Sequence, residues 1–189
     1  MQKSKIDIIP PKDFWIGNTE APVSLVMFGD YESEACAQAH EVVKKLLVDY
    51  DRRLKFNYRH FPLTLIHQKA HKAAEAAIAV AQQGKFWEMH KLLLENQGKL
   101  IRDPNAEGDL VELGKLINVD AESFSKSLRT TDIEQKIAKQ IAQAKSEGIS
   151  GVPTFLINGT KIAQNPNSFE GFDALIMNEL ARLKLLRVH

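Results

Sequence analysis

The order of three segments near the N-terminus constrains the fold more than any other feature. Residues 23–29 form an apolar run rich in β-forming side chains, and the turn residues Ala21-Pro22 precede it. Apolar residues then recur at helical spacing over residues 34–50, and residues 54–60 alternate apolar and polar side chains. The pattern predicts a strand, a helix and a second strand, joined as a parallel, right-handed β-α-β unit.

The middle of the chain has the pattern of helices, and β structure returns only near the C-terminus. Asn158-Gly159 separates two strand-like segments and is the strongest short signal for a β-hairpin. We therefore expect an N-terminal extension at 1–20, an α/β domain made of 21–63 and 149–189, and an inserted helical domain at 64–148. Within these, we predict helices at 67–83, 86–96, 110–117, around Phe124, at 131–147 and at 169–186, a turn at 102–105, and strands at 153–157 and 160–162.

Cysteine content and charge exclude several classes of protein. Cys36 is the only cysteine among 189 residues, so no intramolecular disulfide can stabilise the fold. The formal net charge of +1 favours neither nucleic acid nor an anionic membrane surface as a partner. We find no candidate membrane segment, and the polar N-terminus with Pro10 and Pro11 does not match a signal peptide. We expect a cytoplasmic protein.

Five blocks of sequence resemble the DsbA family of thiol–disulfide oxidoreductases, in family order. The resemblance is closest to the thioredoxin domains fused to some sodium/proton antiporters. It implies a thioredoxin fold, of the α/β class, with an inserted helical domain, and a Cys-x-x-Cys motif at the start of the first helix. The blocks are Ala21-Pro22-Val23, Asp30-Tyr31-Glu32, His60-Phe61-Pro62-Leu63, Gly84 to His90, and Gly151-Val152-Pro153-Thr154-Phe155 with Ile157-Asn158-Gly159.

The motif departs from the family at the position of the attacking thiol. Ser33 takes the place of the first cysteine and Cys36 that of the second, with Glu34 and Ala35 between them. A serine hydroxyl stays protonated at a helix start and cannot exchange disulfides, whereas a cysteine there is a reactive thiolate. The negative charge of Glu34 opposes a thiolate nearby. The two-thiol cycle is therefore expected to be lost.

Each motif residue leaves two interpretations open. Ser33 is either a plain helix N-cap or, as in the kappa-class glutathione transferases that resemble DsbA proteins, a hydrogen-bond donor to the thiolate of bound glutathione. Cys36 is either a buried structural residue with a raised pKa or an exposed monothiol that forms mixed disulfides.

The Val152–Pro153 bond matches the bond that is cis in thioredoxin folds, where the preceding residue pairs with an extended substrate strand. The resemblance thus implies that Val152, Pro153, Tyr31 and Glu34 contact a polypeptide or a protein thiol or disulfide substrate. No metal site is predicted, because His67 and His71 lack a third ligand at suitable spacing.

Three functions remain open at this point. The first is weak or altered redox chemistry through Cys36. The second is non-catalytic binding of a peptide or partner protein. The third is glutathione-dependent transfer or isomerisation that uses Ser33. The first and third make the chain an enzyme and the second does not, and glutathione is the one small-molecule cofactor that these functions involve.

Overall fold

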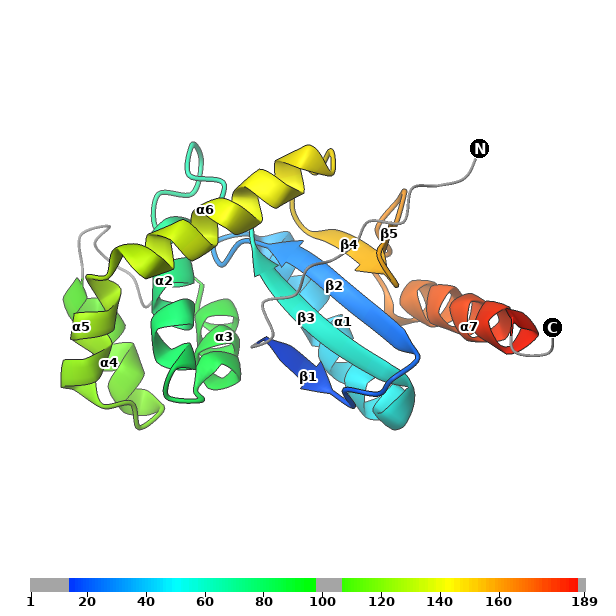
Figure 1. The fold of residues 1–189 in the computed structure, drawn as a ribbon, viewed down its shortest axis with the longest axis horizontal. Coiled ribbons are helices and arrows are strands. Elements are labelled where there is room, and N and C mark those ends of the chain that lie inside the picture. The colour runs from blue at the N-terminus through cyan, green and yellow to red at the C-terminus, as the bar shows by residue number, and fades with distance from the viewer. Residues whose placement is uncertain (1–13, 98–106, 187–189) are drawn as a thin grey trace. The chain divides into compact units, whose positions relative to one another are not determined.

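The computed structural model describes residues 14–97 and 107–186, and its elements follow the predicted order (Figure 1). These residues divide into two compact units. The sheet unit comprises described residues within 1–28, 38–59 and 153–189, and the helical unit those within 29–37 and 60–152. The domain boundaries expected from the sequence stay a prediction. The elements are β1 (Trp15–Gly17), β2 (Val23–Gly29), α1 (Glu34–Tyr50), β3 (Leu54–His60), α2 (Ala70–Ala81), α3 (Phe86–Glu95), α4 (Glu107–Leu116), α5 (Ala121–Leu128), α6 (Thr131–Ser146), β4 (Thr154–Ile157), β5 (Thr160–Lys161) and α7 (Phe169–Leu186), with a 3₁₀ turn at Asp51–Arg53.

The sheet unit contains a mixed five-stranded sheet of order β1-β3-β2-β4-β5. Figure 1 shows β2 and β3 side by side and pointing in the same direction, as the β-α-β pattern predicts. The other neighbouring strands are antiparallel, so that Met27 of β2 pairs with Phe155 of β4. The central strand β2 is almost entirely buried, which explains its continuous apolar run.

Asn158 and Gly159 form the turn of the β4–β5 hairpin. Both residues have positive φ angles, 45° and 77°, which the tight hairpin turn requires and which Asn and Gly tolerate best. The Asn158 side chain also accepts a hydrogen bond of 2.7 Å from the Ser24 N–H and donates one of 3.1 Å to the Pro22 carbonyl. One side chain thus closes the hairpin and attaches it to the start of β2.

Helices α1 and α7 supply the remaining core of the sheet unit. Val43 and Leu46 of α1 are buried. The ring of Phe172 on α7 lies against Phe155 of β4, with centroids 4.8 Å apart. The Tyr50 hydroxyl at the end of α1 donates a hydrogen bond to the Asp173 carboxylate on α7, so the two helices also contact each other.

Helix α2 forms the centre of the helical unit and contacts α3, α4, α5 and α6. Its many alanines are buried, because small side chains let neighbouring helices approach closely from several sides. The predicted start of this helix at residue 67 was wrong, since α2 begins at Ala70. The turn predicted at 102–105 lies outside the described residues. Among residues 14–97 and 107–186, no helix combines the length and apolar character that a membrane span needs.

Candidate functional site

Ser33 is the N-cap of α1, which begins at the next residue. Its hydroxyl oxygen accepts a hydrogen bond of 3.4 Å from the Cys36 N–H, three residues on. Its carbonyl oxygen accepts the first helical hydrogen bonds, from the N–H groups of Cys36 and Ala37. Ser33 is 8% exposed. The serine therefore satisfies one of the free N–H groups at the helix start, as the sequence predicts.

The Cys36 thiol is fully buried, with 0% exposure. The Asp30 N–H donates a hydrogen bond of 3.4 Å to its sulfur. Burial raises the pKa of the thiol from 9.0 to about 11, although hydrogen bonds from Ser33 and from the Asp30 backbone act in the opposite direction. At neutral pH the thiol is therefore protonated and shielded. This is the state expected of a structural cysteine rather than of a nucleophile.

The Asp30 carboxylate connects the motif to the loop between β3 and α2. It is 1% exposed. It accepts hydrogen bonds from the Glu32 N–H and the Leu63 N–H, both at 2.7 Å, and lies 2.9 Å from the Nδ1 atom of His67. The sequence assigned Asp30 to a family block but gave it no role. An acidic residue directly after a buried strand was the only local signal for it.

Tyr31 lies inside the helical unit and supports the motif from within. It is 3% exposed, and its hydroxyl lies 3.1 Å from the Nδ1 atom of His90. Burial raises its pKa well above the usual 10.0. The Gln97 amide donates hydrogen bonds of 2.8 Å to the carbonyl oxygens of both Tyr31 and Ser33. The Gln97 side chain thereby holds the backbone that leads into α1 at two points, the carbonyls of Tyr31 and Ser33.

The remaining predicted site residues lie at or near the surface. Glu34 is exposed at the first position of α1, and Val152 and Pro153 are half-buried directly before β4. The cis geometry expected for the Val152–Pro153 bond stays a prediction, as do the substrate contacts of Tyr31, Glu34, Val152 and Pro153.

His67 and His71 contact different carboxylates. His67 lies in the loop and contacts Asp30, whereas the Nε2 atom of His71 lies 3.3 Å from Glu75. A third histidine, His60, is buried. Its backbone N–H donates to the side-chain oxygen of Gln140, and its Nδ1 atom lies 3.0 Å from the same oxygen. Burial lowers the pKa of His60 to about 4, so the ring is neutral at pH 7.

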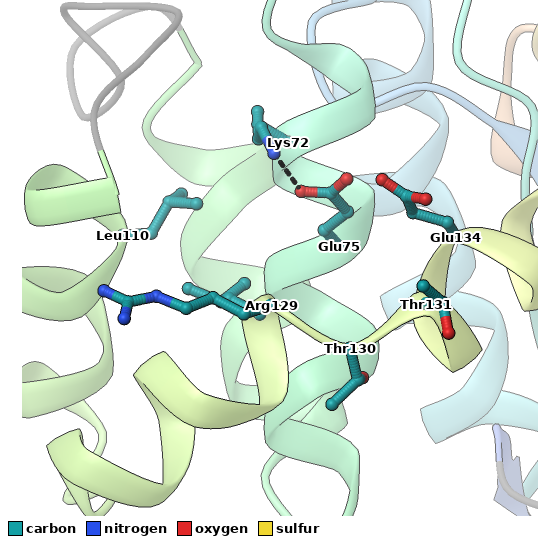
Figure 2. A pocket seen from close by; sticks show the side chains of 8 residues that line it. Lys72, Glu75, Leu110, Arg129, Thr130, Thr131 and Glu134 are labelled. Carbon is teal, nitrogen blue, oxygen red and sulfur yellow. Dashed lines mark hydrogen bonds and ion pairs between the residues drawn. The ribbon is translucent and has the colours of Figure 1, made fainter.

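Figure 2 shows a pocket in the helical unit, formed by α2, α4 and the α5–α6 junction. Its volume is about 390 Å³. Glu75 points into it, is 2% exposed, and accepts a hydrogen bond of 2.7 Å from the Lys72 ammonium. Burial raises the pKa of Glu75, but hydrogen bonds from His71 and Lys72 outweigh that effect and lower it. The Glu75 carboxylate is thus paired with basic side chains of its own helix, α2. The motif residues 33–36 do not line this pocket. The lining residues are Lys72, Glu75, Leu110, Leu128, Arg129, Thr130, Thr131 and Glu134.

The β-α-β unit, the helices between β3 and β4, the terminal hairpin and α7 define a thioredoxin-like protein whose motif has lost its first thiol. A family model described as "Thioredoxin" matches residues 10–178, and the chain therefore belongs to the thioredoxin family. The predicted α/β class and thioredoxin fold with helices inserted between β3 and β4 are confirmed.

Solved structures with this fold include DsbA-like proteins. A thioredoxin-like oxidoreductase from Silicibacter pomeroyi is 26% identical, with a TM-score of 0.75 over 93% of this chain and 94% of that one. BdbD from Bacillus subtilis gives a TM-score of 0.78 at 23% identity, over 89% and 93% of the two chains. For α-DsbA1 from Wolbachia pipientis the TM-score is 0.80 at 19% identity, over 95% and 96%. The last two show the fold alone.

The curated relatives are longer proteins. Na(+)/H(+) antiporter NhaA 3 of Salinispora tropica is 37% identical over 180 residues, which are 95% of this chain and 26% of that protein. NhaA 1 of Mycolicibacterium vanbaalenii is 29% identical over 154 residues, which are 80% and 24%. The chain thus spans about a quarter of the length of the curated relatives it matches. This likeness agrees with the antiporter-fused subgroup that the sequence motifs resemble.

Proposed function

We propose that this chain is a thioredoxin-fold domain that binds an extended polypeptide and has lost the dithiol cycle. The observation that carries the proposal is the state of the motif. Ser33 is a helix cap, and Cys36 is fully buried with a pKa raised to about 11. Disulfide exchange needs an attacking thiolate and an accessible sulfur. Neither motif residue meets both conditions.

The state of the motif weighs against the two enzymatic alternatives. Redox chemistry through Cys36 alone requires a thiolate that reaches the surface, whereas this thiol is protonated and shielded. Glutathione activation by Ser33 requires a hydroxyl free to donate outward. The Ser33 side chain is instead 8% exposed and engaged with Cys36.

The binding role is supported by the segment before β4. Gly151, Val152 and Pro153 are half-buried and belong to the family block that, by resemblance, pairs with an extended substrate strand. Because the NhaA relatives contain the matching region as about a quarter of their length, we propose that it serves as an accessory binding module.

Two variants of Val152 test the binding role. Val152→Pro removes the N–H group that an added strand would use, and Val152→Ala keeps it. Affinity for a fluorescent, unstructured 12-residue peptide is measured by anisotropy, and folding is checked by thermal melting. We expect binding by the wild type and by Val152→Ala, and at least a tenfold loss in a folded Val152→Pro. If all three folded proteins bind the peptide with equal affinity, the proposal that the peptide pairs with the backbone at Val152 is contradicted.

Ser33→Cys tests the loss of chemistry. The wild type is expected to be inactive in reduction of insulin disulfides, whereas Ser33→Cys restores a pair of thiols and is expected to gain activity. Ser33→Cys combined with Cys36→Ala is the matched control, because it carries the attacking thiol without the resolving one. Activity of the wild type above this control contradicts the proposal and favours redox chemistry through Cys36. A rise in the melting temperature of the wild type with millimolar glutathione favours the third function.

A further inference from the structure

The turn between β4 and β5 contains a dipeptide that is chemically reactive in polypeptides. Asn158 is the one asparagine of the chain that is followed by a glycine. A backbone nitrogen can attack the side-chain amide carbon of the asparagine that precedes it. Glycine hinders this attack least, because it has no side chain. The reaction turns the amide into an acid, so Asn158 combines a structural role in the hairpin with a route by which that role is lost.

The side-chain amide of Asn158 is held by four hydrogen bonds within the sheet unit. Its oxygen accepts from the Ser24 N–H at 2.7 Å and from the Ser24 hydroxyl at 3.0 Å. Its nitrogen donates to the Pro22 carbonyl at 3.1 Å and to the Glu179 carboxylate of α7 at 2.7 Å. We call these four bonds the amide contacts. They attach the hairpin turn to the start of β2 and to α7.

The amide contacts oppose the attack of the Gly159 nitrogen on Asn158. Attack makes the amide carbon tetrahedral, which moves its oxygen and its nitrogen away from the positions in which the amide contacts are made. Both turn residues are also held at positive φ angles by the two-residue turn. The reaction therefore has to await an opening of the hairpin in which these contacts are broken.

We propose that Asn158 is a site of spontaneous deamidation, protected in the folded chain, and that its conversion to an acid detaches the β4–β5 hairpin irreversibly. In the open hairpin, the Gly159 nitrogen forms a bond to Cγ of Asn158. The bond between Cγ and Nδ2 breaks, and Nδ2 leaves as ammonia with the proton that the Gly159 nitrogen gives up. Water then opens the resulting succinimide ring at either carbonyl, which gives aspartate or isoaspartate. Water is the co-reactant, and no group is oxidised or reduced.

The acid products cannot remake the amide contacts. A carboxylate at residue 158 has no N–H group to donate to Pro22 or to Glu179. The Glu179 side chain is 14% exposed, and hydrogen bonds from Arg182 and Asn158 lower its pKa, so it is ionised at neutral pH. Two carboxylates then face one another where a hydrogen bond of 2.7 Å was made, and their like charges repel. Isoaspartate also lengthens the backbone within a tight turn.

The first test compares deamidation in the folded chain and in guanidinium chloride, at pH 8, by mass spectrometry of the peptide that contains residue 158. We expect the unfolded chain to react at least about tenfold faster. Glu179→Ala removes one of the amide contacts and should accelerate the reaction of the folded protein at least about threefold. Glu170→Ala is the matched control, because it removes an exposed glutamate from the same helix. Equal rates in the folded and unfolded chains, or equal acceleration by both variants, overturn the protective role of the amide contacts.

The second test concerns the product. Asn158→Asp carries the acid from the start, and Asn158→Gly removes the amide without adding a charge and still tolerates a positive φ. The backbone N–H of residue 158 donates to the Ser24 carbonyl, so its hydrogen exchange, corrected for intrinsic rates, reports detachment of the hairpin. We expect exchange at least about tenfold faster in Asn158→Asp than in the wild type, and an intermediate rate in Asn158→Gly. An Asn158→Asp chain that fails to fold while Asn158→Gly folds also supports the release. Exchange at the wild-type rate in Asn158→Asp overturns it.

Discussion

The burial of Cys36 leads to a quantitative prediction for its reactivity. Its pKa is about 11 in the folded chain, against 9.0 for the free thiol. Two pKa units correspond to about 100-fold less thiolate at any pH below 9, and only the thiolate attacks electrophiles. Because the sulfur is also inaccessible, folded Cys36 is expected to react at least about 100-fold more slowly than the same residue in the unfolded chain.

Timed alkylation with iodoacetamide at pH 7.5, followed by mass spectrometry of the intact protein, measures this ratio. The denatured chain in urea gives the reference rate. Sub-denaturing urea should accelerate labelling of Cys36, because the reaction then proceeds through transient opening of the helix start. A folded protein that labels within tenfold of the denatured rate refutes the argument, and it restores a monothiol function for Cys36.

The same pKa shift links stability to pH. As the pH rises through 9, the unfolded chain releases the thiol proton first, so unfolding becomes more favourable until the folded thiol ionises near pH 11. The free energy of unfolding is expected to fall by up to about 2.7 kcal/mol from this group across that window, at about 1.36 kcal/mol for each pKa unit. Urea titrations of the wild type and of Cys36→Ala isolate the effect, since all other groups are common to both. If the difference in the free energy of unfolding between the wild type and Cys36→Ala stays constant from pH 8 to 11, the predicted contribution of the thiol is contradicted.

Three further predictions concern neighbouring groups. Ser33→Ala should lower the free energy of unfolding by about 1 kcal/mol through loss of the N-cap, and Ser33→Asp should retain most of it, as urea titration will show. Asp30→Asn replaces the carboxylate that accepts from the Leu63 N–H. It should lower the free energy of unfolding by about 1–3 kcal/mol and speed hydrogen exchange at the Leu63 amide. His60 has a folded pKa of about 4 against 6.5. The unfolded chain therefore binds the proton first as the pH falls, and stability should be lost between pH 6.5 and 4 relative to His60→Gln, while the NMR signals of the ring stay constant above pH 5.

The elements that the sequence predicted best are those defined by their own periodicity. The predicted bounds 23–29, 34–50, 54–60 and 169–186 agree with β2, α1, β3 and α7. Each has a buried stripe or run that its residues encode locally, with a clear turn or cap at one end. The three-residue strand β1 was not predicted, because so short a segment has no measurable periodicity, and its pairing with β3 is a long-range contact.

The start of α2 shows where local reasoning fails. The alanine-rich pattern extends to residue 67, and helix propensity alone favours that start. In the structure, the carboxylates of Asp30 and Glu32 engage His67 and the Lys69 N–H, which holds residues 63–69 in a loop. These partners lie 37 residues apart in the chain. No pattern within the helix could indicate them.

The contacts of the candidate site also divide into local ones, which the sequence could predict, and long-range ones, which it could not. The cap formed by Ser33 was predictable, since its partner lies three residues along the chain. The support of the motif by Gln97 and the connection of Asp30 to Leu63 were not predictable, since both join residues 29–37 to parts of the helical unit that are distant in sequence. The sequence could state two interpretations of Cys36, but only its burial separates them.

The serine itself explains how the first motif position can lack a thiol while the fold is kept. The first motif position is a helix N-cap, where serine ranks among the most stabilising residues. A cysteine there contributes a weaker acceptor and is retained for its reactivity. Replacing it by Ser33 therefore removes the nucleophile and strengthens the helix start. The surrounding contacts of Asp30, Tyr31 and Gln97 do not depend on a thiol. These contacts therefore hold the start of α1 in place whether position 33 carries a thiol or a hydroxyl.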